Sequence, residues 1–306
     1  MTKLRIASFT NLGYLLHARG FEPIDADMNG KTVVVTGASG GLGLETSRQL
    51  GALGARVIMV GRNEGKLREA RETVDGPASI EVADLSLMAD VRDVGERILK
   101  SEHRVDVLVN NVGVLLPERE MTNEGLEKTL ATNLAGHFLL TNLLTSRLLE
   151  SPPARVINVS SGGMYSEKIE PDDLQFAGRE YSGTAAYAHA KRGQVILTEM
   201  WAERFPDRRL VFHSMHPGWV ATAGVAQSMP TFNKVMKPFL RTPEQGADTI
   251  VWLVAAEESA ASTGHFWFDR TMAPTHLMDS TKEKPEDRIR LWDALVALTG
   301  SDVVVS

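Results

Sequence analysis

The stretch Thr36-Gly37-Ala38-Ser39-Gly40-Gly41-Leu42-Gly43 decides how this sequence folds, because it joins a β-branched run to a helical pattern. The run is Lys31–Thr36 and the helical pattern covers Leu42–Leu53. Glycines at such a junction allow a tight turn, a close approach of the backbone to a pyrophosphate, and close contact between helix and strand. The unpaired N–H groups of the helix N-terminus then favour phosphate. A glycine-rich turn is weak evidence alone, but in this position it predicts nucleotide binding rather than a merely tight turn.

Further along the chain, short β-branched runs alternate with longer helical patterns, which is typical of βα units on a parallel sheet. Several runs are almost continuously apolar, as expected where helices cover both faces of the sheet. The predicted strands are Lys31–Thr36, Arg56–Val60, Ser79–Val82, Val105–Asn110, Arg155–Ser160, Leu210–Met215 and His265–Phe268. The predicted helices are Leu42–Leu53, Glu64–Val74, Leu87–Ser101, Asn123–Leu149, Ala185–Phe205 and Gln245–Ala256. The sequence therefore predicts an α/β fold, with a Rossmann-like, doubly wound parallel sheet of about seven strands.

The domain organisation follows from the absence of any repeat, low-complexity block or linker that would mark a boundary. We expect one domain over residues 31–306, preceded by an extension over residues 1–30 that contains a short amphipathic helix lying over the domain. The apolar segment Leu4 to Gly20 is interrupted by polar residues and lacks the unbroken core of a signal peptide. No stretch approaches the ~20 apolar residues that span a bilayer. A weak peripheral membrane contact stays open as an alternative.

Composition excludes several classes of function. The net charge is −6 and no run of lysine or arginine stands out, so no nucleic-acid partner is expected. The chain has no cysteine, which removes disulfides, thiolate metal sites and cysteine nucleophiles, and is compatible with a cytoplasmic location. The eight histidines show no His-Glu-x-x-His pairing, and no metal site is expected.

The residue after the second strand bears on the choice of dinucleotide. An acidic residue about 20 positions after the glycines would bind a ribose 2′-hydroxyl and indicate NAD. Arg62 stands there instead, and its guanidinium can pair with a 2′-phosphate. The pattern favours NADP(H), while NAD(H) and an exposed arginine without a role stay as alternatives.

Tyr187 and Lys191 lie four residues apart in a helical pattern, so they share one helix face. A free tyrosine has a pKa of about 10, and a nearby lysine cation lowers that pKa by favouring the phenolate. The pair is therefore a candidate proton donor with its activating charge. An ordinary surface pair on a helix is the alternative.

Motifs of a known type occur in a fixed order along this chain. They are the Thr36–Gly43 turn, Asp84-Leu85, Asn110-Asn111-Val112-Gly113, Asn133, Ser161, Tyr187 with Lys191, and His216-Pro217-Gly218-Trp219-Val220-Ala221-Thr222. With these motifs the chain resembles the short-chain dehydrogenase/reductase family over roughly Lys31 to Phe268. Within that family it resembles the retinol-dehydrogenase-like branch.

The resemblance implies a role for each matching residue. Tyr187 would be the acid in carbonyl reduction and the base in alcohol oxidation. Lys191 would lower the pKa of Tyr187 and hold the nicotinamide ribose hydroxyls. Ser161, rather than Ser160, would bind the substrate oxygen. Asn133 would anchor a water that links Lys191 to solvent.

The resemblance also implies a set of cofactor contacts. Asp84 and Leu85 would border the adenine, Asn110 and Gly113 the adenine ribose, and Thr222 the nicotinamide carboxamide. The full predicted set is Gly37, Ser39, Gly41, Leu42, Gly43, Arg62, Asp84, Leu85, Asn110, Gly113, Tyr187, Lys191, Pro217, Gly218, Val220 and Thr222.

Two features of the chain depart from the commoner pattern of the family. Val112 stands where alanine is commoner, which crowds the wall of the cofactor cleft slightly. The excursion Gly162–Gly183 is longer than in most members, although the retinol-dehydrogenase-like branch shares it.

The expected function is NADP(H)-dependent interconversion of a carbonyl and an alcohol. We expect substrate specificity in Gly162–Gly183 and in a lid over residues 223–241, with a permanently packed lid helix as the alternative. The lid's apolar residues favour a hydrophobic small-molecule substrate; they are Val225, Met229, Phe232, Val235, Met236 and Phe239. A non-catalytic dinucleotide sensor and an epimerase or dehydratase on the same fold are the rival functions. A homodimer is one assembly that the chain could form.

Overall fold

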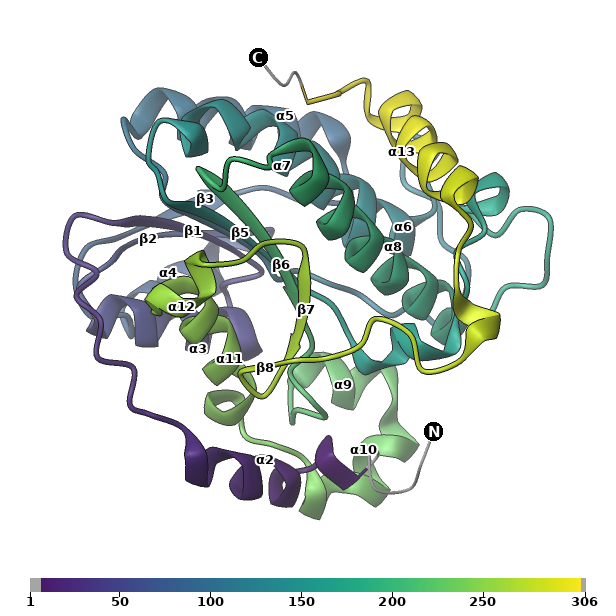
Figure 1. Cartoon of the computed structure of the whole chain (residues 1–306). Coiled ribbons are helices and arrows are strands. Elements are labelled where there is room, and N and C mark those ends of the chain that lie inside the picture. The colour runs from purple at the N-terminus through teal and green to yellow at the C-terminus, as the bar shows by residue number, and fades with distance from the viewer. Residues whose placement is uncertain (1–6, 304–306) are drawn as a thin grey trace.

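The computed structural model describes residues 7–303, which form one α/β domain around an eight-stranded sheet (Figure 1). The strand order is β3-β2-β1-β4-β5-β6-β7-β8, and every pair is parallel except β7 with β8. The strands are β1 Thr32–Thr36, β2 Arg56–Gly61, β3 Ala78–Val82, β4 Val107–Asn110, β5 Ala154–Val159, β6 Leu210–Met215, β7 His265–Phe268 and β8 Thr271–Met272. The doubly wound parallel sheet is confirmed, and β8 adds one strand to the predicted seven.

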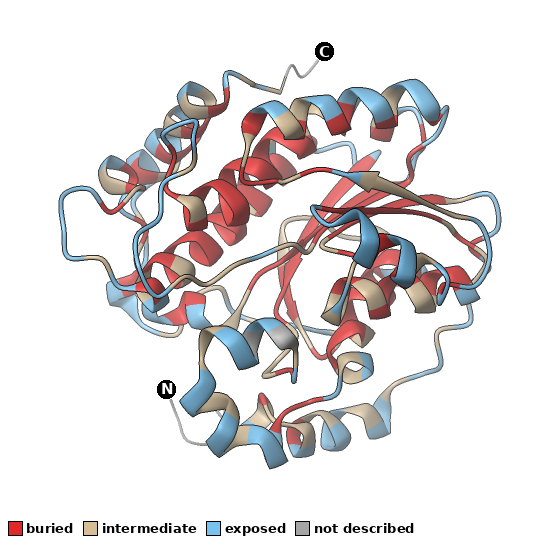
Figure 2. Cartoon of the chain, turned by 180° about the vertical axis from the view of Figure 1, so that it is seen from behind, coloured by how far each residue is buried: buried red, intermediate tan, exposed pale blue. Residues whose placement is uncertain are grey.

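Helices cover both faces of the sheet because neighbouring residues of one strand point to opposite faces. In β1, Val33 and Val35 pack in one apolar core and Val34 packs in the other. The first core lies under α3 Gly41–Ala52, α4 Glu64–Arg71 and α11 Pro243–Ala255, with the short α12 Glu257–Ala260 following α11. The second lies under α5 Met88–Ser101, α7 Gly136–Leu149, α8 Gly183–Arg204 and α13 Pro285–Thr299. Figure 2 shows the buried strands between helices whose outer faces are exposed.

The predicted helix Asn123–Leu149 starts later than expected. Gly125 has φ +78° in a turn, and the Glu127 carboxylate caps the helix by accepting from the N–H groups of Thr129 and Leu130 at 2.8 and 2.6 Å. The helix therefore begins with α6 Lys128–Leu130, continues as a π-helical turn over Ala131–Ala135, and ends as α7.

The sequence did not predict helix α13, because the charged residues in its first half are typical of solvent-exposed surface. The second half buries Leu291, Trp292 and Leu295 in the core beneath α7 and α8. The Trp292 ring lies 5.0 Å from Phe138 and 6.0 Å from Trp201, measured between ring centroids. This C-terminal helix is therefore an integral part of the domain.

The N-terminal extension and the lid are both helical. In the N-terminal extension, α2 covers Asn11–His17 and a 3-10 helix covers Ala18–Gly20, while residues 1–6 of the predicted extension lie outside the described residues. The lid consists of α9 Ala223–Ser228, α10 Pro230–Met236 and a 3-10 helix Lys237–Phe239, rather than one helix. Figure 1 shows α2 beside α10, and the Asn11 side chain donates to the Pro238 carbonyl at 3.2 Å. Within residues 7–303, every helix is too short or too polar to cross a membrane.

Candidate active site

The predicted nucleotide turn lies between β1 and α3, and its geometry requires glycine. Gly37 and Gly41 have φ +68° and +54°, values that other residues rarely adopt. A Cβ on Gly43 would overlap the Gly37 carbonyl and lie 2.6 Å from Nδ2 of Asn111. The turn therefore leaves a cradle free of side chains at the N-terminus of α3, which fits a dinucleotide pyrophosphate.

Asn111 fixes this turn to β1, a role that sequence reasoning did not assign to it. Its Nδ2 donates to the Thr36 carbonyl at 2.8 Å, and its backbone N–H donates to the Thr36 hydroxyl at 2.9 Å. The only signal in the sequence is the position of Asn111 directly after β4, which neighbours β1 in the sheet.

The loop after β6 reaches the glycine turn at one residue. Thr222 lies 3.4 Å from the position that a Cβ on Gly41 would occupy. Val220 and Leu42 instead pack toward α11, where both lie 2.6 Å from a Cβ placed on Gly246. The structure thus brings Thr222 to the cradle, whereas the side chains of Leu42 and Val220 hold α3, α11 and the loop together.

Arg62 follows β2 directly and is exposed. Among the described residues, it has no hydrogen-bond or ion-pair partner. Its neighbour Asn63 is committed to capping α4 by accepting from the Lys66 N–H at 2.9 Å. The guanidinium is therefore available at the end of the strand next to the glycine turn.

Three predicted adenosine contacts have side chains that are engaged elsewhere. Asp84 accepts from the N–H and hydroxyl of Ser86 at 3.0 and 2.8 Å, and Leu85 is buried. Asn110 is wholly buried and donates to Asn158 and to Thr141, both at 2.9 Å. Asn110 therefore links β4 to β5 and α7, and only its backbone can border a ribose.

The four predicted catalytic residues come together beside β5 and α8. The hydroxyl of Ser161 lies close enough to the phenol of partly buried Tyr187 to lower the pKa of that phenol. The Ser160 hydroxyl points away and donates to the Lys191 carbonyl at 2.9 Å. The hydroxyls of the two serines are therefore directed to different partners.

Lys191 is buried one helical turn after Tyr187, under the ring. Its Nζ lies 5.5 Å from the Tyr187 ring centroid and donates to the Val159 carbonyl at 2.7 Å. A Cβ on Gly113 would lie 3.4 Å from this Nζ and 3.1 Å from Oδ1 of Asn133. Gly113 therefore leaves space free of a side chain beside Lys191, whereas the resemblance placed Gly113 at the adenine ribose.

The charges in this cluster are set mainly by burial. Burial raises the pKa of Tyr187, and the hydrogen bond from Ser161 offsets part of that rise. Burial lowers the pKa of Lys191 to about 7, so its ammonium is only partly protonated near neutral pH. The expected lowering of the Tyr187 pKa by Lys191 is not seen here, because the Lys191 amine, with a pKa of about 7, is uncharged at the pH where the phenol titrates.

Asn133 lies in the π-helical turn that precedes α7, and π-helical turns are frequent at functional sites. Its side chain pairs with the backbone of Val114, accepting from the N–H and donating to the carbonyl, both at 2.8 Å. Its own carbonyl accepts from Nε2 of Gln194 at 2.8 Å. Asn133, which was expected to anchor a water, thus already has a protein partner at its backbone carbonyl. Gln194, which provides that partner, is a further residue that sequence reasoning missed.

The excursion Gly162–Gly183 is fixed to α8 by two residues without a predicted role. Nε2 of His189 accepts from the Glu170 N–H at 2.8 Å, and burial lowers the pKa of His189 to about 4. Arg192 donates to the carbonyls of Met164 and Thr275 at 2.9 and 2.6 Å. His189 and Arg192, on either side of Lys191 in the sequence, therefore position the loop that follows Ser161.

The loop Pro217–Trp219 is held by Arg241, whose importance the sequence did not reveal. Gly218 has φ +76°, and a Cβ there would overlap the Arg241 guanidinium. Arg241 forms a buried ion pair with Asp269 and donates to the carbonyls of Ser8 and Phe9 at 2.7 and 3.2 Å. The N-terminal segment is thereby joined to the predicted cofactor loop.

Phe9 completes this arrangement. Its ring lies edge-on to His216, Trp219 and Phe268, at centroid distances of 4.6, 5.8 and 5.4 Å. The backbone N–H of Trp219 also donates to the Phe9 carbonyl at 2.9 Å. Trp219 is therefore part of the packing between the N-terminal segment and the loop.

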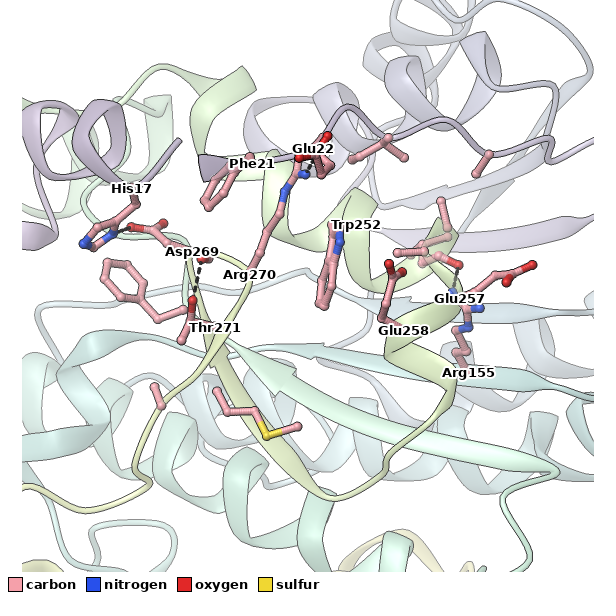
Figure 3. A pocket seen from close by; sticks show the side chains of 18 of the residues that line it. His17, Phe21, Glu22, Arg155, Trp252, Glu257, Glu258, Asp269, Arg270 and Thr271 are labelled. Atoms are coloured by element: carbon pink, nitrogen blue, oxygen red, sulfur yellow. Dashed lines mark hydrogen bonds and ion pairs between the residues drawn. The ribbon is translucent and has the colours of Figure 1, made fainter. Parts of the chain in front are cut away.

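A cavity of about 1190 Å³ lies beneath residues 20–28, between this segment and the edge of the sheet (Figure 3). Arg270 closes one side: it pairs with Asp248, donates to the Glu22 carbonyl at 2.6 Å, and lies 4.6 Å from the centre of the Phe21 ring. None of the four predicted catalytic residues lines this cavity. The cavity is therefore not lined by the cluster that contains Tyr187.

The chain is similar to known proteins over most of its length. A family model described as short chain dehydrogenase matches residues 31–232. Dehydrogenase/reductase SDR family member 12 of Bos taurus is 38% identical, covering 96% of this chain and 94% of that protein. Human retinol dehydrogenase 13 is 32% identical, covering 91% of this chain and 87% of that protein. A short chain dehydrogenase of Shigella flexneri, crystallised with NADP, superposes with a TM-score of 0.64 at 26% identity, covering 81% of this chain and all of that one.

The chain therefore belongs to the short-chain dehydrogenase/reductase family of oxidoreductases. Within the family it lies in the retinol-dehydrogenase-like branch, as the sequence predicted.

Proposed function

We propose that this protein interconverts a carbonyl and an alcohol with NADP(H), with Tyr187 as the general acid and base. The observation that carries the proposal is that the buried Lys191 Nζ lies 5.5 Å from the centre of the Tyr187 ring, while the Ser161 hydroxyl interacts with the Tyr187 phenol. A protein that only senses a dinucleotide needs the glycine cradle alone. The additional cluster of Ser161, Tyr187 and Lys191 therefore favours an enzyme.

The protein's part in this reaction is to bind, orient and move a proton. When bound, NADP(H) would supply or accept the hydride. In carbonyl reduction the Tyr187 hydroxyl would donate its proton to the substrate oxygen, while the Ser161 hydroxyl donates a hydrogen bond to the same oxygen. In alcohol oxidation Tyr187 would accept the proton. Asn133 and Gly113 would keep the wall beside Lys191 open and rigid.

The preference for NADP(H) rests on Arg62. Its exposed and unpaired guanidinium lies where a 2′-phosphate would extend from an adenosine ribose bound at the end of β2. The Shigella relative crystallised with NADP is in line with this choice.

We propose a hydrophobic substrate. In the lid, Met229, Phe232 and Met236 are partly buried, and the Phe232 ring lies edge-on to Trp219 at a centroid distance of 5.4 Å. One of the similar proteins is named for retinol, an apolar alcohol. Val225 was expected in the same set, but its side chain lies outside those that the structure describes.

Two further expectations belong to this proposal. The cysteine-free sequence suits a reducing compartment, and we propose a cytoplasmic location. The homodimer stays a prediction, which light scattering of the purified protein would check.

The test is an NADPH-consumption screen over aldehydes, ketones, retinoids and steroids, with NADH in parallel. We expect turnover with apolar carbonyls, abolished in Tyr187→Phe. Tight NADPH binding without turnover on any class would instead favour the dinucleotide sensor.

A further inference from the structure

Gln194 lies on α8, one helical turn after Lys191, and its side chain is almost wholly buried. Its Nε2 donates to the backbone carbonyl of Asn133 at 2.8 Å and lies 2.6 Å from Nδ1 of His137. Burial lowers the pKa of His137 to about 3, so the ring is neutral near neutral pH and Nδ1 can accept the second N–H of the amide. One side-chain amide of α8 therefore bridges the π-helical turn and the start of α7.

Packing alone does not account for a glutamine at position 194. Among the residues that the structure describes, Oε1 of Gln194 has no hydrogen-bond partner, and burial of an unpaired polar atom is unfavourable. A methionine would fill nearly the same volume without that cost. The contribution of Gln194 therefore lies in its amide nitrogen, which reaches Asn133 and His137.

The carbonyl that Gln194 binds belongs to an irregular part of the helix. Over Ala131–Ala135 the turn is π-helical, and the Gly136 N–H donates to the Ala131 carbonyl, five residues earlier. Such a turn contains one residue more than the corresponding α-helical turn. A side chain that inserts into the ladder of helical hydrogen bonds is a known cause of helix distortion. The Gln194 amide is therefore placed to stabilise the π-helical register.

The register of this turn decides which way Asn133 faces. Each residue of an α-helix advances by about 100°, so a change to α-helical register would turn Asn133 away from its present neighbours by about that angle. Its side chain now forms two hydrogen bonds of 2.8 Å with the backbone of Val114. A Cβ on Gly113 would lie 3.1 Å from Oδ1 of Asn133 and 3.4 Å from Nζ of Lys191. Asn133 and Lys191 thus border the same small space.

We propose that Gln194, with His137 behind it, is a positioning residue whose amide holds the π-helical turn in register and so keeps Asn133 beside Lys191. The kinetic consequence of this inference rests on the proposed function. The position of Asn133, however, can be measured without turnover, because the backbone N–H of Val114 donates to its side chain.

Hydrogen exchange of the Val114 amide, followed by NMR, tests the position of Asn133. Gln194→Met removes the donor at nearly constant size, and we expect it to accelerate this exchange at least about tenfold. The matched control is Asn142→Leu, which removes another hydrogen bond between α8 and α7, from Nε1 of Trp201 to Oδ1 of Asn142 at 3.1 Å. Unchanged exchange in Gln194→Met, or equal acceleration in Asn142→Leu, would overturn the proposal. Urea unfolding checks that each variant is folded.

Two variants of His137 test its supporting role. His137→Leu removes the acceptor of the second Gln194 N–H, and it should accelerate exchange at Val114 as Gln194→Met does. His137→Asn offers an amide oxygen near the position of Nδ1 and should restore slow exchange. Equal acceleration in both variants would contradict the role assigned to His137.

The kinetic consequence is tested with NADPH and an apolar carbonyl substrate. Gln194→Met should lower kcat at least about tenfold and change KM less than about twofold, because Asn133 borders Lys191 rather than the substrate. A raised KM with unchanged kcat would contradict the positioning role. A wild-type protein without turnover on any carbonyl would refute the proposed function, while the exchange at Val114 would still decide whether Gln194 positions Asn133.

Discussion

The guanidinium of Arg241 and the carboxylate of Asp269 form a bidentate ion pair, with N–O distances of 2.5 and 2.8 Å, and both side chains are almost wholly buried. Nδ1 of His17 lies 2.7 Å from the same carboxylate (Figure 3). Arg241 also binds the Ser8 carbonyl and the loop at Pro217. One ion pair thus joins the N-terminal segment, the loop after β6 and the β7–β8 hairpin.

Arg241→Met should destabilise the protein strongly, because it leaves the Asp269 carboxylate buried without its cation. Breaking such a pair costs about 3–5 kcal/mol, whereas replacing both partners by apolar residues costs less. We expect urea unfolding to show a smaller loss for Arg241→Met combined with Asp269→Leu than for Arg241→Met alone. Arg270→Met, at the less buried pair with Asp248, is the control and should cost less. If the single and double variants lost the same free energy of unfolding, the contacts of Arg241 with backbone carbonyls would be its main contribution to stability.

Tyr187→Phe should remove turnover while leaving NADPH binding nearly intact, because only the transferable proton is lost. General acid catalysis is worth about 10²–10⁴-fold. Stopped-flow single turnovers and fluorescence titration separate the two effects. Tyr14→Phe, on α2, is the matched control. A variant that retained more than about a tenth of the wild-type rate would rule out Tyr187 as the acid.

Arg62→Ala should reduce the difference in binding affinity between NADPH and NADH. A charge-assisted hydrogen bond contributes about 1.5–3 kcal/mol, or about ten- to a hundredfold in affinity. Fluorescence titration of both cofactors measures this difference. Arg68→Ala is the control, since Arg68 is exposed on α4 and paired with Glu64. Tighter NADH binding by the wild-type protein would exclude the proposed role of Arg62.

The lid over residues 223–241 should be cut by protease in the free protein and protected with NADP and an apolar substrate analogue. Its helices carry exposed Val235 and Phe239 and do not contribute to the main cores. Mass spectrometry of the fragments identifies the cut. Equal resistance in both states would show that the lid is packed permanently on the domain.

His189→Gln should reduce the loss of stability in acid. The pKa of His189 falls from 6.5 to about 4 on burial, so between these values the unfolded chain binds a proton that the folded protein does not. Stability therefore falls as the pH falls from 6.5 toward 4. Glutamine can still accept from the Glu170 N–H but does not titrate. Urea unfolding at several pH values should show a shallower slope in the variant, and an unchanged slope would assign the acid sensitivity to other buried histidines.

Local patterns predicted the βα units that build the sheet. They also predicted the glycine turn, because its strand, turn and helix N-terminus are neighbours in the sequence. Helix spacing also placed Tyr187 and Lys191 on one face, whereas Ser161 was assigned only through the resemblance to the family. Local patterns missed β8, a two-residue strand after a hairpin in which Asp269 and Arg270 have φ +49° and +55° without a glycine signal. They missed α13 because charged residues occupy its first turns.

The direction of individual side chains was harder to predict than their position. Asn110 and Leu42 lie in the expected motifs, yet their side chains pack inside the protein. The Arg241–Asp269 pair joins residues from separate elements, and no local spacing signals a contact that forms only when the chain has folded.

Helix α13 has a consequence for how the protein responds to dilution. Its Leu291, Trp292 and Leu295 cover aromatic residues of α7 and α8 with a segment of the same chain. An apolar face covered from within a chain stays covered at any protein concentration, whereas a face covered by a second subunit is exposed on dissociation. The folding free energy that this side of the sheet contributes is therefore independent of concentration, and any pairing of two copies must use a different surface.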